Sequence, residues 1–229
     1  MIHSSKFLIL RDLPFFRSLL DMQLEQVVTQ AEFVKYKKGE MVYQEGDDIS
    51  SVYIVHKGDI KSGRKSANDK ILLKEIVYKK ELLGENILTA KQARTEFAQA
   101  LTDLELFELP VVFFKDLLSK NPQLCQELTL ILINKMSNLE TRMSNFVFKK
   151  AQTRILNFLK QLADVKGIKI GLDEILVNHG LSHKEIANIT DTSRQTVARV
   201  LGDLKRQNVI HFSARKPHKI LIRNIMNLS

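Results

Sequence analysis

The chain has 229 residues, more than a typical single domain contains, and this length predicts two domains. With 44% hydrophobic and 27% charged residues, the composition excludes a disordered chain. The formal net charge of +9 is concentrated in residues 151–229, where 13 lysines and arginines face 6 acidic residues, and this excess predicts a polyanionic partner, either nucleic acid or an anionic membrane surface.

The cysteine count and the apolar stretches narrow the possible classes further. Cys125 is the single cysteine, which excludes an intramolecular disulfide and a cysteine-ligated iron–sulfur cluster. We expect this thiol to be buried and structural. No segment reaches the roughly 18 apolar residues of a membrane span, and the N-terminal apolar stretch is too short for a signal peptide. We therefore expect a cytoplasmic protein without a membrane partner.

Residues 1–120 predict a β-rich domain with flanking helices. Residues 17–33 place Leu20, Leu24 and Val27 on one helical face, which indicates a short helix. From Val34 to Leu109 short β-branched and aromatic runs alternate with turns, and five of the nine glycines lie between Gly39 and Gly84. Closely spaced strands with glycine turns are typical of a small antiparallel β-barrel or jelly roll.

Residues 121–150 predict one long amphipathic helix. Asn121 is a candidate cap and Pro122 suits the first helical position. Apolar residues then recur at steps of three and four, beginning at Leu124 and continuing through Leu128, Leu132, Met136, Leu139, Met143 and Phe146. About 28 residues span roughly 40 Å, longer than a small barrel can cover. We therefore expect this stripe to pair with a second copy in a parallel dimer.

Residues 151–229 predict a winged helix-turn-helix domain. After an amphipathic helix and a glycine-containing stretch, Ser182 and Glu185 have the spacing of a capping box. The turn "TDTS" then offers Thr192 or Ser193 as the cap of a second helix, and the tail "VIHFSARKPHKILIRN" reads as two strands joined by a basic turn. The overall expectation is an α+β protein whose domains cover 1–120, 121–150 and 151–229.

The second helix of this motif separates its side chains into two faces. Val197, Val200, Leu201 and Leu204 fall on one side, whereas Arg194, Gln195 and Arg199 fall on the other, near its N-terminal end. Arginine can bond guanine O6 and N7 bidentately, and glutamine suits adenine N6 and N7. We predict that the polar face reads bases in the major groove of double-stranded DNA.

This order of β-barrel, long helix and "LSHKEIANITDTSRQTVARVLGDLKRQNVI" resembles the CRP/FNR family of bacterial transcription regulators along essentially the whole chain. The resemblance implies a homodimer on a pseudo-palindromic operator, with RNA polymerase as a further partner. It also implies base reading by Arg194, Gln195 and Arg199. Phosphate contacts are implied for Ser182, His183, Lys184, Ser193 and Thr196. Gln195 stands where the cAMP receptor protein has glutamate, and Asp191 replaces the usual turn glycine.

The segment "LLGENILTAKQARTEFAQA" resembles the phosphate-binding cassette of cyclic-nucleotide-binding domains. Gly84 and Glu85 match the pair that meets the ribose, and Arg94 and Thr95 match the pair that meets the cyclic phosphate. The cassette departs from the family in a shortened interval, in Glu96 after the hydroxyl, and in Leu139 and Glu140 where the cAMP receptor protein has its adenine-binding Thr-Ser pair. A cyclic nucleotide, another effector and no ligand all remain open.

Other functions are weaker alternatives. A lone cysteine excludes an iron–sulfur sensor, and His3 and His56, the only histidines before residue 150, give no basis for a haem site. No metal cluster, nucleophile arrangement or phosphate loop indicates an enzyme. A cyclic-nucleotide-binding module that regulates a protein partner is the alternative function, but it has no use for the basic C-terminal domain.

Overall fold

The computed structural model describes residues 2–67, 71–88, 92–213 and 219–223. The chain forms two compact units, Met1–Asn138 and Leu139–Ser229, which divide within one long helix. The predicted helix range 121–150 is therefore shared between the two units. Among the described residues, no helix combines the length and hydrophobicity needed to cross a lipid bilayer.

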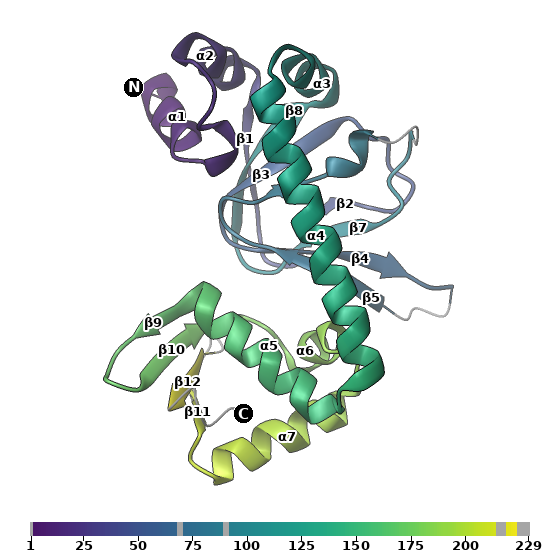
Figure 1. Cartoon of the computed structure of the whole chain (residues 1–229), viewed down its shortest axis with the longest axis vertical. Coiled ribbons are helices and arrows are strands. Elements are labelled where there is room, and N and C mark those ends of the chain that lie inside the picture. The colour runs from purple at the N-terminus through teal and green to yellow at the C-terminus, as the bar shows by residue number, and fades with distance from the viewer. Residues whose placement is uncertain (1, 68–70, 89–91, 214–218, 224–229) are drawn as a thin grey trace. The chain divides into compact units, whose positions relative to one another are not determined.

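The first unit is a jelly-roll-like pair of antiparallel sheets with helices before and after it (Figure 1). Its helical elements are α1 (Ile2–Arg11), the short 3-10 helix η1 (Pro14–Phe16), α2 (Asp21–Gln30), η2 (Glu85–Leu88), α3 (Val111–Lys120) and α4 (Pro122–Phe148), which continues into the second unit. Its strands are β1 (Glu32–Tyr36), β2 (Met41–Tyr43), β3 (Ser51–Lys57), β4 (Ile60–Lys65), β5 (Ile71–Val77), β6 (Leu82–Leu83), β7 (Phe97–Ala100) and β8 (Leu104–Pro110).

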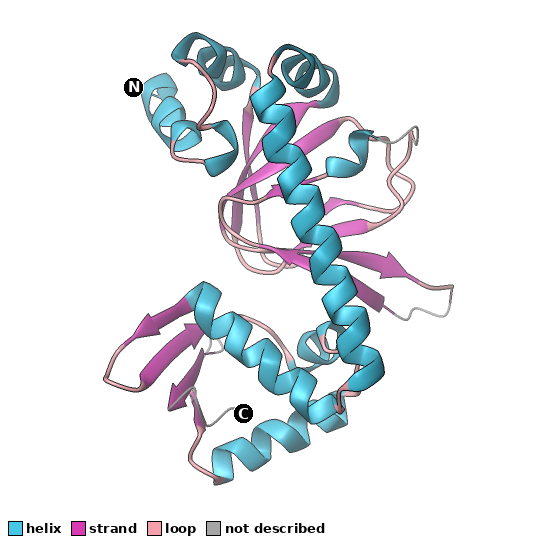
Figure 2. Cartoon of the chain, in the orientation of Figure 1, coloured by secondary structure: helices cyan, strands magenta, loops and turns pink. Residues whose placement is uncertain are grey.

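The strands form two four-stranded sheets, in the orders β1-β8-β3-β6 and β2-β7-β4-β5. The predicted antiparallel jelly roll is therefore confirmed, although the strands build two facing sheets and not one closed barrel. Every pairing within these sheets is antiparallel, as between β3 and β8, where Ile54 lies opposite Phe107. Figure 2 shows these strands gathered together, with α1, α2 and α3 lying at one end of them.

Strands β3 and β8 separate two apolar cores because successive side chains of a strand point to opposite faces. The helix-side core receives Val52, Ile54, Phe107 and Leu109, and the inner core receives Tyr53, Val55, Leu104 and Leu106. A strand buried on both faces reads as a continuous apolar run, and "SVYIV" in β3 has this pattern. The helix-side core also takes in Leu124 and Leu128 of α4.

The second unit contains the predicted winged helix-turn-helix and one hairpin that the sequence did not reveal. Its elements after α4 are α5 (Ala151–Lys166), β9 (Gly167–Lys169), β10 (Glu174–Asn178), α6 (His183–Ile189), α7 (Arg194–Arg206), β11 (Ile210–Phe212) and β12 (Lys219–Arg223). The four strands form one antiparallel sheet in the order β11-β12-β10-β9. Buried residues of α5, α6 and α7, among them Leu159, Ile186 and Leu201, form the core under this sheet.

Three expectations about α4 require correction. Cys125 is exposed, because the helix buries Leu124 and Leu128 and turns the intervening thiol away from the core. The side chain of Asn121 does not cap α4; it donates to the carbonyl of Leu117 at 2.7 Å and accepts from Gln23 at 2.6 Å. Leu128, expected at the dimer seam, is 2% exposed within its own unit and is not available to a second copy.

Candidate nucleic-acid interface and ligand pocket

Helix α7 presents the two faces that its sequence predicts. Val197, Val200, Leu201 and Leu204 are buried, and Arg194, Gln195 and Arg199 are exposed. Within the part of the chain that the structure describes, no hydrogen bond or ion pair engages the three exposed side chains. Their donors are therefore available to a partner molecule. Near the opposite end of the helix, Arg206 pairs with Asp203.

The residues expected to meet phosphates cluster at the starts of α6 and α7, and several are already engaged. Ser193 caps α7 by accepting from the N–H of Thr196 at 3.0 Å, and the two hydroxyls lie 2.9 Å apart. Ser182 caps α6 and forms the predicted capping box with Glu185, to whose carboxylate its hydroxyl donates at 2.9 Å. A phosphate contact through the Ser182 hydroxyl would therefore require an exchange of this bond.

Two other parts of the predicted interface lie beside these caps. His183 is half-buried, and Lys184 is exposed. Strands β11 and β12 form the predicted wing, but its basic turn, residues 214–218, lies outside the described residues.

Of the four cassette residues of the first unit, Arg94 is the most deeply buried, and Gly84 lies beside it. Gly84 has φ +97°, a conformation that favours glycine, and a Cβ atom there would lie 3.1 Å from Nη1 of Arg94. Glu85 and Arg94 are buried, at 7% and 2% exposure, and Thr95 is half-buried. The N–H of Arg94 donates to the carbonyl of Asp47 at 2.7 Å, which anchors the backbone beneath its side chain. Gly84 and Arg94 are thus brought together as the cassette predicts.

The guanidinium of Arg94 is held by aromatic rings and one carbonyl. Its carbon lies 4.3 Å from the ring centre of Tyr43 and 5.5 Å from that of Tyr53, within cation–π range. Nη2 donates to the carbonyl of Ser51. Burial raises the pKa of Tyr53 to about 12, so this ring stays neutral at physiological pH. Nε and Nη1 have no hydrogen-bond partner among the described residues.

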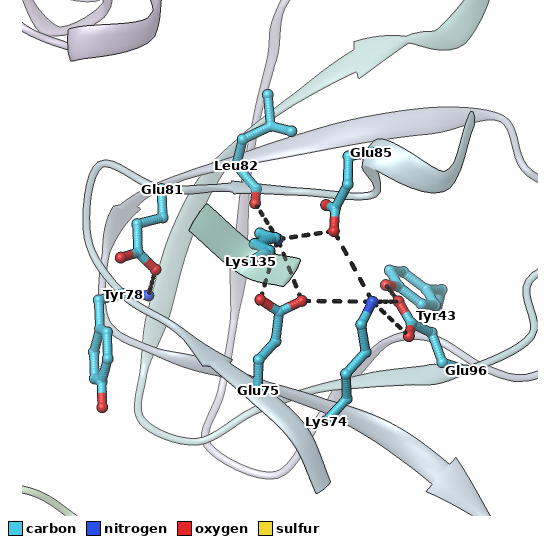
Figure 3. Close-up of polar contacts among 9 residues, drawn as sticks. All are labelled: Tyr43, Lys74, Glu75, Tyr78, Glu81, Leu82, Glu85, Glu96 and Lys135. Atoms are coloured by element: carbon cyan, nitrogen blue, oxygen red, sulfur yellow. Dashed lines mark hydrogen bonds and ion pairs between the residues drawn. The ribbon is translucent and has the colours of Figure 1, made fainter. Parts of the chain in front are cut away.

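A lysine that sequence reasoning missed lies beside Glu85 of the cassette. Lys135 of α4 donates to Oε1 of Glu85 at 2.9 Å, to Oε1 of Glu75 at 3.2 Å and to the carbonyl of Leu82 at 3.2 Å (Figure 3). Lys74 lies beside it and pairs with Oε2 of Glu96 at 3.1 Å. Lys74 therefore offsets the negative charge that Glu96 brings to the cassette, while Oε2 of Glu85 has no partner among the described residues.

The charges of this cluster shift one another's pKa. Burial alone would raise the pKa of Glu85, but the ammonium of Lys135, assisted by Lys74, outweighs burial and lowers it. Burial likewise opposes the charge of Lys135, but Glu85 and Glu75 outweigh it and raise the lysine pKa. For Glu75 burial prevails over Lys135, and its pKa is raised. Lys135 thus favours the ionised form of Glu85, the cassette residue that is expected to contact a ligand.

The C-terminal two-thirds of α4 carries an exposed apolar stripe. Leu132, Met136, Leu139, Met143 and Phe146 are between 37% and 67% exposed. They are the residues expected at a dimer seam, apart from the buried Leu128. Glu140, expected in the position of an adenine-binding residue, is exposed. A row of large apolar side chains left in water on one helix is unfavourable unless a partner covers it.

Two family models match the chain. The first, the cyclic nucleotide-binding domain, covers residues 33–121, and the second, the Crp-like helix-turn-helix domain, covers residues 153–229. The first range contains Arg94 and the other cassette residues, and the second contains the helices α6 and α7.

Curated relatives and a solved structure match most of the chain. The CRP-like cAMP-activated global transcriptional regulator of Mycobacterium tuberculosis is 23% identical over 200 residues, covering 87% of this chain and 89% of that protein. The global nitrogen regulator of Synechococcus elongatus is 27% identical over 204 residues, covering 86% and 87%. The structure of FixK2 from Bradyrhizobium japonicum has a TM-score of 0.76 at 20% identity, covers 86% of this chain and 95% of that one, and supports the fold.

Proposed function

The chain belongs to the CRP/FNR family of DNA-binding transcription regulators, and from this premise we propose that it reads a pseudo-palindromic operator as a homodimer. Two copies of α7 would enter successive major grooves about 34 Å apart. The observation that carries this proposal is the exposed, unengaged set of Arg194, Gln195 and Arg199 on a helix whose opposite face is buried. The winged helix-turn-helix domain favours this role over a module that acts only on a protein partner.

The chemistry of the three side chains defines what each would contribute. Arg194 and Arg199 present planar guanidinium forks that suit the O6 and N7 acceptors of guanine, and Gln195 suits adenine. The net charge of +7 in residues 151–229 would add sequence-independent attraction to phosphates. Bound to DNA in the cytoplasm, the dimer would recruit or block RNA polymerase. Ser182, His183, Lys184, Ser193 and Thr196 would position the domain on the phosphate backbone.

The first unit would bind the controlling signal, a small molecule that carries an anionic group and a hydroxyl, as a cyclic nucleotide does. The supporting observation is that Nε and Nη1 of Arg94 and Oε2 of Glu85 are buried without a partner among the described residues. Each such atom costs about 1–3 kcal/mol when it stays unsatisfied. A phosphate facing Arg94 and Thr95 and a ribose hydroxyl facing Glu85 would remove that cost.

Replacement of Arg199 tests the DNA-reading role. Arg199→Ala should weaken binding to an operator selected by the wild-type protein by about 1–3 kcal/mol for each lost base contact, and the dimer loses one contact in each half-site. Arg206→Ala is the matched control, because it removes an arginine from the last turn of the same helix, away from the reading residues. Fluorescence anisotropy with the operator and with a scrambled duplex separates specific from general affinity. Equal operator affinity in both variants would overturn the assignment.

A further inference from the structure

The turn between α6 and α7 contains a residue in a conformation that favours glycine. Asp191 has φ +52°, in the left-handed region, which costs free energy for a residue with a Cβ atom. Asp191 lies three residues before Arg194, the first residue of α7. Whatever fixes Asp191 therefore also fixes the end of α7 that carries the reading residues.

Asp191 is held by an arginine from α4. Nε of Arg142 donates to Oδ2 of Asp191 at 2.8 Å, and Nη2 donates to Oδ1 at 2.7 Å, so the guanidinium binds both carboxylate oxygens. The same Nη2 donates to the carbonyl of Asn188, near the end of α6, at 3.1 Å. The two charged side chains are only 24% and 20% exposed. A bidentate, partly desolvated pair has a far better defined geometry than a surface ion pair.

A second arginine holds the backbone of the same turn. Arg154 of α5 donates from Nε to the carbonyl of Thr190 at 2.9 Å and from Nη2 to the carbonyl of Asp191 at 2.7 Å. Its guanidinium carbon lies 5.3 Å from the ring centre of Phe146, which is also on α4. Cations at the C-terminal end of α6 are favourable to its dipole. The turn is therefore joined both to α5 and to the last turns of α4.

We propose that Arg142 and Asp191 form a positioning pair that fixes the direction of α7 against the C-terminal part of α4, and thereby the half-site spacing that a dimer accepts. The proposal rests on the DNA-reading role of α7 and on pairing of α4 with a second copy. Leu139 and Met143 of the exposed stripe flank Arg142 along α4, so this arginine lies between residues of the expected dimer seam while its side chain contacts the turn before α7. The pair then links the dimer seam to the base-reading residues. Glycine, the usual residue at this turn position, could not form the link because it has no carboxylate.

Half-site spacing is the quantity that this pair should control. One additional base pair displaces a half-site by about 3.4 Å along the duplex and also rotates it. A dimer in which Arg142 and Asp191 hold α7 rigidly should bind such an operator weakly, whereas a dimer without this pair should bind it with less loss of affinity. Loss of stability alone would instead weaken binding to correctly spaced and misspaced operators by the same factor.

Asp191→Gly is the decisive variant, because it removes the carboxylate and relieves the positive φ at the same time, so that the turn can keep its shape. Arg142→Gln removes the other partner, and Arg142→Lys retains charge without the bidentate fork. Glu174→Gln is the matched control: it breaks the 3.0 Å pair between Glu174 and Arg223, which is in the same unit but does not involve the turn. Each full-length variant is titrated with the selected operator and with versions that have one base pair inserted or deleted between half-sites.

In Asp191→Gly and Arg142→Gln, the ratio of affinities for correctly spaced and misspaced operators should decrease about tenfold, a typical coupling between two sites. In Arg142→Lys this ratio should lie between that of these variants and that of the wild type. Glu174→Gln should keep the wild-type ratio. An unchanged ratio in both Asp191→Gly and Arg142→Gln would overturn the positioning role while leaving the DNA-reading role intact. If the wild-type protein selects no operator with two half-sites, the proposed function and the positioning role both fail.

Discussion

At the scale of single residues, Lys135 shows how one side chain can balance a cluster of charged groups. Its ammonium contacts two carboxylates and one carbonyl, and Lys74 lies 3.7 Å from Glu75 and 3.9 Å from Glu85. Together with Arg94 and Glu96, the cluster contains three cations and three carboxylates. These buried and partly buried charges can lie close together because each carboxylate has a lysine beside it.

Lys135→Met should lower the free energy of unfolding of the first unit by about 3–5 kcal/mol, because it leaves Glu75 and Glu85 largely buried without their main cation. All four tyrosines lie between Tyr36 and Tyr78 and the chain has no tryptophan, so tyrosine fluorescence during urea denaturation reports this unit. Lys35→Met is the matched control; it breaks an exposed pair with Glu105 and should cost less than about 1 kcal/mol. Equal losses in the two variants would contradict the role of Lys135.

The pH dependence of the same difference has a defined sign. Because the pKa of Lys135 is raised in the folded protein, its stabilisation is complete below the ordinary value of 10.5 and is lost as pH rises through the folded pKa. The stability difference between the wild type and Lys135→Met should therefore be constant from pH 8 to 10 and shrink above 10.5. Urea titrations across this interval measure it, and a difference that grows with pH would contradict the assigned ion pairs.

At the scale of elements, periodicity predicted α4 and α7 well because both faces of a helix can be read from residues three and four apart. It did not predict β9 and β10, since "KGIKIGLDEILVN" alternates only briefly and its glycines resemble those of a loop. The stripe also predicted Leu128 at the seam, because a stripe does not show where the core ends along a helix. Burial of Cys125 was expected from its being a lone cysteine, and residue type does not show which face of a helix a residue occupies.

For the candidate sites, too, the sequence could predict only what one element contains. Arg194, Gln195 and Arg199 could be grouped from sequence because one helix carries all three. Lys135, Glu75 and Glu85 come from separate elements, and Arg142 is 49 residues from Asp191. The sequence alone contains no signal for such pairs, since they depend on how distant segments pack.

Leu139→Glu tests the exposed stripe of α4 as a dimer seam. A carboxylate buried in each copy should cost at least about 2 kcal/mol per chain, which weakens dimerisation by roughly a thousandfold. Ser137→Glu is the matched control, because it adds the same charge on the opposite, exposed side of the helix. Sedimentation equilibrium should show monomers for the first variant and dimers for the second. A dimer that survives Leu139→Glu would place the seam elsewhere.

At the scale of the whole molecule, the buried, unpartnered atoms of the first unit and the exposed reading face of the second would act in one regulator. A ligand that binds differently to the DNA-competent and DNA-incompetent states shifts operator affinity, and by linkage DNA shifts ligand affinity by the same factor. The cluster around Lys135 would take part in this coupling, because it joins α4 to Glu85, the carboxylate proposed to meet the ligand hydroxyl.

Calorimetry with cAMP and cGMP tests the ligand site through Arg94. Arg94→Lys keeps the charge but loses the planar fork, and it should weaken binding by about 10- to 150-fold, the worth of one charge-assisted hydrogen bond of about 1.5–3 kcal/mol. Arg64→Ala is the control, because Arg64 is exposed on β4. Binding of equal strength to wild type and Arg94→Lys would place the ligand outside the cassette. If neither nucleotide binds the wild type, the signal is not cAMP or cGMP, and Arg94 would bind another anion. A thermal-shift screen of small hydroxylated anions would then identify that ligand, because it should stabilise the wild type but not Arg94→Lys.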